Sequence, residues 1–141
     1  MADNETTTNT AATAPVTSLS AGAVIRDVLT HDAGVAAITS NVYPIITDEA
    51  TLPYVLYRRT SLDHNTSKAG APGADTVRIE VVCYAATYAG SIALAEAVRA
   101  ALDYKQATVG TMTMRGCFLE SADETWEDDA YGQQLIFNVK I

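Results

Sequence analysis

The spacing of apolar residues predicts two amphipathic helices. One covers Ala21–Asp32 and is preceded by Ser20, and the other covers Tyr88–Asp103 and is preceded by Thr87. Ser and Thr are favoured at a helix N-cap, and apolar residues recur every three or four positions in both segments. These positions are Val24, Ile25, Val28 and Leu29 in the first helix, and Ile92, Ala95, Val98 and Leu102 in the second.

Two shorter features flank the first helix. Residues 1–18 are rich in Thr, Ala and Asn and show no apolar period, so we expect a flexible N-terminal arm. At the C-terminal end of the helix, Asp32 is placed to cap a short turn over Ala33–Ser40. Pro44 then closes the region, because the residue before a proline avoids the helical conformation.

Alternation of apolar and polar residues predicts two strands joined by a long loop. In Leu52–Thr60 and Thr76–Ala85, successive side chains point to opposite faces. In the first strand, one face carries Tyr54, Leu56 and Arg58, and the other carries Val55, Tyr57 and Arg59. In the second strand, one face carries Val77, Ile79, Val81 and Cys83, and the other carries Arg78, Glu80, Val82 and Tyr84. Between them, the Gly, Pro, Asn and Ser content of Ser61–Ala74 predicts a mobile loop. The two strands are therefore expected to form an extended antiparallel hairpin.

Further strands are predicted in the C-terminal part. Thr111–Gly116 and Cys117–Trp126 are short strand-like runs, and Gln133–Ile141 has an apolar face. That face consists of Leu135, Phe137, Val139 and Ile141. The order of the segments predicts an α+β fold, with a mainly antiparallel β-sheet packed against two or three α-helices and a long β-hairpin loop.

Length and charge narrow the possible functions. A chain of 141 residues fits one domain, which we place at residues 19–141. The net charge of −8 disfavours binding to nucleic acid or to an anionic membrane, because both depend on clustered Lys and Arg. No apolar run approaches the roughly 20 residues of a membrane span, and no signal-peptide pattern is present, so a cytosolic protein is expected.

Few residues are candidates for catalysis or metal binding. His31 is expected at a helix C-terminus, and His64 lies in the predicted loop, where no rigid neighbours would hold a catalytic group. Cys83 and Cys117 stand far apart in predicted strands, which favours buried, reduced thiols. No phosphate-binding glycine pattern occurs. We therefore expect no enzyme activity, no cofactor and no metal site.

An acidic run follows the strand-like segment at Cys117. Residues 121–132 read SADETWEDDAYG and contain Asp123, Glu124, Glu127, Asp128 and Asp129. A calcium loop needs oxygen ligands at alternating positions, a central glycine and a closing glutamate, and this run lacks that spacing. We interpret it as a solvated acidic turn between strands; a weak cation site or a partner contact is the alternative.

Several local features stand out in the order of segments: the Val42-Tyr43-Pro44 step, the strand start LPYV at residues 52–55, and the join from Tyr84 and Ala85 into the helix that begins at Thr87 and Tyr88. That helix contains the run AEAVR, and the chain closes on NVKI. In these features and their order the sequence resembles the small tail-completion proteins, or tail terminators, of long-tailed bacteriophages and prophages. The resemblance covers roughly residues 20–141, nearly all of the predicted fold.

The resemblance implies a structural virion protein of the phage tail or neck, assembled in the cytoplasm of the bacterial host. Its copies would form a ring, usually a hexamer, that terminates the tail tube and joins it to the head connector, with DNA only as passing cargo in the lumen. The family has no catalytic residues to transfer. A small non-enzymatic α+β binding module without ring assembly is the alternative.

The predicted loop tip is the candidate contact site of such a ring subunit. Four of its residues are expected to contact the tail tube or a neighbouring copy: His64, Asn65, Lys68 and Pro72. Loops held at the end of a rigid hairpin are common binding elements, and a tip that is mobile in the free subunit can order on its partner.

Overall fold

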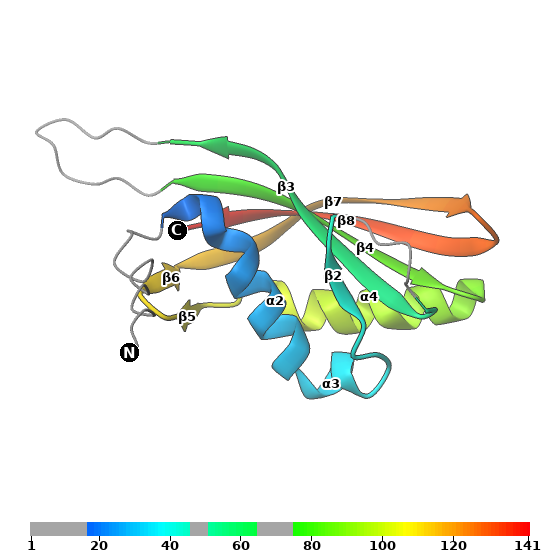
Figure 1. The fold of residues 1–141 in the computed structure, drawn as a ribbon. Coiled ribbons are helices and arrows are strands. Elements are labelled where there is room, and N and C mark those ends of the chain that lie inside the picture. Colours follow the sequence, from blue (N-terminus) through cyan, green and yellow to red (C-terminus); the bar gives the residue numbers. More distant parts are fainter. Residues whose placement is uncertain (1–16, 46–50, 65–74) are drawn as a thin grey trace, which may run out of the picture.

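The computed structural model describes residues 17–45, 51–64 and 75–141 (Figure 1). The helical segments are η1 (Ser18–Ser20), α2 (Ala21–His31), α3 (Ala33–Ala36) and α4 (Tyr88–Leu102). The strands are β2 (Val42–Pro44), β3 (Tyr54–Asp63), β4 (Thr76–Ala85), β5 (Ala107–Val109), β6 (Met112–Met114), β7 (Gly116–Glu127) and β8 (Ala130–Lys140). Residues 1–16 of the predicted arm lie outside the described residues.

The main sheet has five strands in the order β2-β3-β4-β8-β7. β2 runs parallel to β3, and the three other pairs are antiparallel. A separate two-stranded sheet joins β5 to β6. In Figure 1, α2, α3 and α4 all lie on one side of the main sheet. The predicted α+β fold with a mainly antiparallel sheet is therefore confirmed.

The core lies between the main sheet and α2 and α4. We call the sheet face that packs on these helices the helix face, and the opposite one the open face. Four alternate residues of β4 are completely buried on the helix face, as predicted: Val77, Ile79, Val81 and Cys83. The same holds for Phe137 and Val139 of β8. On α4, Leu94 is fully buried while Ile92 is only partly so, which shifts the packed face slightly from the predicted stripe.

Two of the three predicted helix caps form. The Thr87 hydroxyl accepts a hydrogen bond from the Gly90 amide at 3.0 Å, and the Asp32 carboxylate accepts one from the Val35 amide at 3.0 Å. The Ser20 cap was wrong, since its side chain makes no capping bond. Because the 3-10 turn η1 leads directly into α2, the Thr17 side chain caps that turn instead.

Three strand predictions need correction. Residues 61–63 were assigned to the loop, but β3 continues to Asp63 because its register with β4 extends to Thr76, beyond a bulge at Thr60. Val42–Pro44 was read as a boundary and forms β2, which pairs with residues 55–57 of β3. The strand β5 was not predicted at all; it pairs with β6 inside the predicted run 111–116.

Candidate assembly surfaces

The base of the β3–β4 hairpin is a small polar cluster. His64 follows β3, is exposed, and places Nδ1 at 2.8 Å from Asp75 Oδ1. Ser18 Oγ donates a hydrogen bond to the other oxygen, Asp75 Oδ2, at 2.5 Å. The cluster thus ties η1 to both arms of the hairpin. Of the four predicted contact residues only His64 can be placed; Asn65, Lys68 and Pro72 lie outside the described residues.

This Ser, Asp and His arrangement differs from that of a hydrolytic enzyme. In a catalytic triad the imidazole lies between the hydroxyl and the carboxylate, so that it can remove the hydroxyl proton. Here the Asp75 carboxylate lies between Ser18 and His64. The other histidine, His31, is the last residue of α2, and its Nδ1 lies 2.8 Å from the Asp27 carbonyl oxygen. The Asp75 contacts join segments of the fold, and the His31 contact lies within α2.

The described part of the chain was also compared with what a metal site and a membrane-spanning helix require. No group of three or more His, Cys, Asp or Glu side chains is arranged there to hold a metal ion. None of its helices combines the length and apolar character that crossing a membrane requires. The thiols of Cys83 and Cys117 are free and buried, as predicted, and burial raises the pKa of each to about 12.

The open face carries a cluster of three tyrosines: Tyr43 of β2, Tyr54 of β3 and Tyr84 of β4. The rings of Tyr54 and Tyr84 are 5.1 Å apart, and those of Tyr43 and Tyr54 are 6.4 Å apart. Val82 and Ala130 are buried beside them, with Leu52 and Leu56 partly buried. Burial and, for Tyr84, the hydrogen bond to Glu127 raise the pKa of Tyr54 and Tyr84. The hydroxyls of Tyr54 and Tyr84 therefore stay protonated to a higher pH than that of an exposed tyrosine.

A shallow groove of about 230 Å³ runs beside the tyrosine cluster. Leu56, Val82 and Tyr84 line it together with the exposed Ile45. Two of its charged residues form an ion pair, with Arg58 Nε 2.9 Å from Glu80 Oε1, and the third, Glu127, accepts a hydrogen bond from the Tyr84 hydroxyl. A second ion pair on the open face joins Arg78 to Glu120 at 2.6 Å and holds the pKa of the Glu120 carboxyl below its usual range. Arg58 and Arg78 are thus both paired with carboxylates of their own copy.

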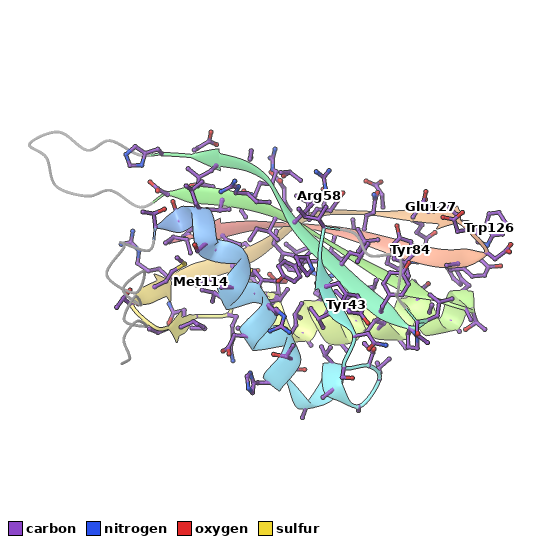
Figure 2. The ribbon with its side chains drawn as sticks, viewed as in Figure 1. Tyr43, Arg58, Tyr84, Met114, Trp126 and Glu127 are labelled. Atoms are coloured by element: carbon purple, nitrogen blue, oxygen red, sulfur yellow. The ribbon has the colours of Figure 1, made fainter. Side chains whose placement is uncertain are left out.

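The β7–β8 hairpin ends in an exposed aromatic and acidic tip, which Figure 2 shows at Trp126 and Glu127. Trp126 is 59% exposed and pairs across the strands with Tyr131, which is 37% exposed. The Tyr131 ring meets Tyr88, at the start of α4, edge-on at 5.9 Å. Side chains this large are usually covered when they gather in one place.

The acidic run is strand rather than turn over most of its length. Asp123, Glu124 and Glu127 belong to β7, and only Asp128 and Asp129 form the turn, both with positive φ. Glu124 Oε2 accepts hydrogen bonds from Tyr88 Oη at 2.5 Å and from Gln133 Nε2 at 3.1 Å. The first of these bonds raises the pKa of Tyr88. Within the described part, none of the five acidic residues forms an ion pair with Lys, Arg or His.

Both edges of the main sheet are partly uncovered. β2 pairs only with residues 55–57 of β3, so residues 58–63 have no strand of the described part on the side away from β4. At the opposite edge, the Tyr104 amide bonds to the Cys117 carbonyl and the Leu119 amide bonds to Asp103. Residues 120–127 of β7 lie beyond these bonds and are exposed on both faces, apart from the half-buried Thr125.

Sequence reasoning missed the tyrosine cluster and the aromatic tip. The cluster depends on strand register, which brings Tyr54 opposite Tyr84, and no local pattern reveals that pairing. The tip could have been found, since Trp126 stands beside acidic residues in a run without an apolar period. A large aromatic residue in such a run is a signal of an exposed contact.

Comparison with known proteins agrees with the fold and the sequence pattern. A family model described as "Tail completion protein gp17" matches residues 23–141. Among solved structures, a chain of "Virion of native gene transfer agent (GTA) particle" matches with a TM-score of 0.70 and 20% sequence identity, covering 82% of this chain and 90% of that chain. No curated protein sequence matches. The structural likeness shows that the two chains share a fold.

Proposed function

The chain belongs to the tail completion protein gp17 family, and from that premise we propose that its copies form a closed ring that terminates the phage tail tube and joins it to the head connector. Membership makes the protein a structural component of the virion tail. It associates there with other structural proteins of the phage. The observation that carries the proposal is the family match, which spans the chain from the first turn of α2 to the last residue.

The ring we propose is a hexamer, and its role is structural rather than catalytic. Six copies at −8 each carry a charge of about −48 before counterions bind. Such a surface repels the phosphate backbone, so DNA would pass through the lumen without being retained. The protein's partners in the ring are then other copies of itself, the tail-tube protein and the head connector protein.

The residues at the tip of the β3–β4 hairpin are proposed to contact one of these partners. The four proposed contact residues are His64, Asn65, Lys68 and Pro72. His64 belongs to the polar cluster that Asp75 forms with Ser18 at the base of the hairpin, and the other three follow it in the chain. The polar cluster fixes the base of the hairpin, so a contact made at the tip is held by a rigid support. Residues 1–18 are proposed to act as an N-terminal arm of the folded domain 19–141, joined to that domain through Thr17, which caps η1, and Ser18, which bonds to Asp75.

The mass of the assembled protein tests the ring directly. Size-exclusion chromatography with light scattering on the purified chain should show a closed species near six times 14.9 kDa, either alone or after addition of purified tail tubes. Electron microscopy of that species should show a ring with a central opening. A species near 14.9 kDa under both conditions, with no density at the tube end, would instead support a binding module that does not assemble.

A further inference from the structure

We propose that neighbouring copies in the ring join edge to edge, with the uncovered part of β3 in one copy pairing antiparallel to the uncovered part of β7 in the next. The sheets of successive copies would then form one continuous β-wall. This inference rests on the proposed ring and specifies its interface. Its two surfaces are residues 58–63 of β3, called the basic edge, and residues 120–127 of β7, called the acidic edge.

Both edges have backbone groups available for a partner. The Val55 amide and the Tyr57 carbonyl point away from β4, since they bond to Asn41 and Ile45. Backbone groups alternate along a strand, so those of Arg59 point the same way, where no described strand meets them. Residues 58–61 are all exposed, as are seven of the eight residues of the acidic edge. A sheet edge left open in this way is a template for another strand.

The charges of the two edges are complementary. The basic edge carries Arg58 and Arg59 and ends at Asp63, while the acidic edge contains Glu120, Asp123, Glu124 and Glu127 and no Lys or Arg. Arg58 and Glu120 are already paired with Glu80 and Arg78 of their own copy. Within the described residues Arg59 and Glu124 form no ion pair, so these two charges are the ones that a neighbouring copy can meet. Pairing of two like edges would bring equal charges together, whereas pairing of unlike edges brings opposite charges together. This is the requirement for a ring, whose interface must join two different surfaces of the same chain.

When the sheet continues from one copy to the next, side chains of opposite charge on the two edges also lie on the same face of the sheet. Arg59 lies on the helix face, where its Nη1 donates to the Leu19 carbonyl at 3.3 Å. Glu124 lies on the same face, where it bonds Tyr88 of α4. An uninterrupted sheet therefore places Arg59 of one copy on the same side as Glu124 of the next. Arg58 shares the open face with Asp123 in the same way, since both lie opposite residues of that face.

The strand directions and offsets fit a closed wall. From β3 to β7 each strand is antiparallel to the next, so β3 of a second copy would lie antiparallel to β7 of the first. Asp123, near the middle of the acidic edge, pairs with Gln134, which pairs with Val82, which pairs with Leu56, so Asp123 and Leu56 lie at the same height in the sheet. The middle of the basic edge lies four or five residues beyond Leu56 along β3. Joining the edges thus requires a shift of about 15 Å along the strands for every four strands, or about 19 Å, across them. The resulting tilt of about 38° lies within the range of about 35–45° found in closed β-barrels.

Charge reversal tests the pairing in the full chain. Arg59→Glu and Glu124→Arg should each lower the fraction of protein in rings on purified tail tubes by about tenfold, because each places like charges across every interface. The double variant R59E/E124R should return that fraction to within about twofold of the original protein. Glu96→Arg, which changes an exposed residue on α4, is the matched control and should leave assembly unchanged.

Cysteine cross-linking gives a second readout that does not depend on charge. Thr60→Cys combined with Ala122→Cys, Asp123→Cys or Glu124→Cys should give a ladder of disulfide-linked multimers under mild oxidation, in at least one of the three combinations. Cys83 and Cys117 are buried and stay silent. Thr60→Cys combined with Glu96→Cys should give no ladder. Rings that form without β3–β7 cross-links and without rescue by the double reversal would overturn the edge pairing and leave the ring intact, whereas an original protein that never forms rings would overturn both.

Discussion

Tyr84 Oη donates a hydrogen bond of 3.0 Å to Glu127 Oε1 and thereby connects β4 to the end of β7 across the intervening strand β8. The Tyr84 ring can cross β8 only because Gly132 lies beneath it. A Cβ atom at Gly132 would come within 2.8 Å of Tyr84 Cε1 and 2.7 Å of Thr125 Cγ2. The end of the β7–β8 hairpin is therefore held to the sheet by a side chain that needs a glycine to reach its partner.

Gly132→Val is expected to lower the free energy of unfolding by about 1–3 kcal/mol, because the added side chain must displace the Tyr84 ring from its hydrogen bond with Glu127. Urea denaturation followed by Trp126 fluorescence measures the change. Ala122→Val adds a similar volume at an exposed position of β7 and should change the stability little. Equal stability of both variants would show that the position of the Tyr84 aromatic ring does not depend on Gly132.

The two Ser and Thr residues that precede long helices should respond differently to substitution. Thr87→Ala removes the hydrogen bond to the Gly90 amide and should lower the free energy of unfolding by about 1 kcal/mol. Ser20→Ala should have almost no effect, because the Ser20 side chain makes no capping bond. Thermal or urea unfolding of the two variants beside the original protein decides the comparison. A larger loss from Ser20→Ala than from Thr87→Ala would contradict the assignment.

The buried thiols should make the fold sensitive to alkali. Burial raises the pKa of Cys83 and Cys117 to about 12, above the ordinary value of 9.0 that applies once the chain unfolds. The folded state therefore holds these protons more tightly, and stability is complete below pH 9 and falls as the pH rises towards 12. The loss should be about 1 kcal/mol per pH unit for each thiol in that window. Urea unfolding at pH 8, 9.5 and 10.5 measures it.

Alkylation tests the same burial by a different route. The native chain should react with iodoacetamide at pH 8 much more slowly than the urea-unfolded chain, because the thiolate is the reactive form. Ser121→Cys places a thiol on the exposed part of β7 and should react rapidly in the folded protein. Fast modification of the native original chain at Cys83 or Cys117 would show that these sites open more readily than their burial implies.

Local sequence was sufficient to predict the elements whose signal is confined to one segment. The first half of the β4 strand, up to Val81, alternates because its helix face is fully buried, and Thr87 and Asp32 cap helices through bonds three residues away. β2 could not be predicted, since a strand of three residues has no period and forms only through its parallel partner 13 residues further along the chain. The run Cys117–Trp126 was predicted as a strand and forms β7, but the interpretation of Asp123, Glu124 and Glu127 as part of a turn was wrong. That part of β7 is exposed on both faces apart from the half-buried Thr125, so it shows no apolar alternation.

The candidate contact surfaces depend on strand order, which sequence alone did not supply. Arg58 and Arg59 were visible as a basic pair and the acidic run as a cluster, but only the order β2-β3-β4-β8-β7 places them on opposite edges of one sheet. The tyrosine cluster likewise needs the register that sets Tyr54 against Tyr84. Pairing between segments distant in the chain is a tertiary property, set by packing and register rather than by local propensity.

Deletion of residues 65–73 tests the proposed contact at the hairpin tip. It leaves His64, Ala74 and Asp75 between the ends of β3 and β4, and three residues are enough to close a β-hairpin. The pair between His64 and Asp75 lies at the base, so the subunit should fold with near-original stability in urea unfolding.

In phage whose own copy of the gene is disabled, the deleted chain should give mostly separate heads and tails in electron micrographs. A Gly/Ser segment of equal length in place of residues 65–73 is the control: if it also fails, the side chains of the tip make the contact, and if it restores joining, only the length of the loop matters. Normal numbers of joined virions with the deleted chain would show that the tip takes no part in assembly.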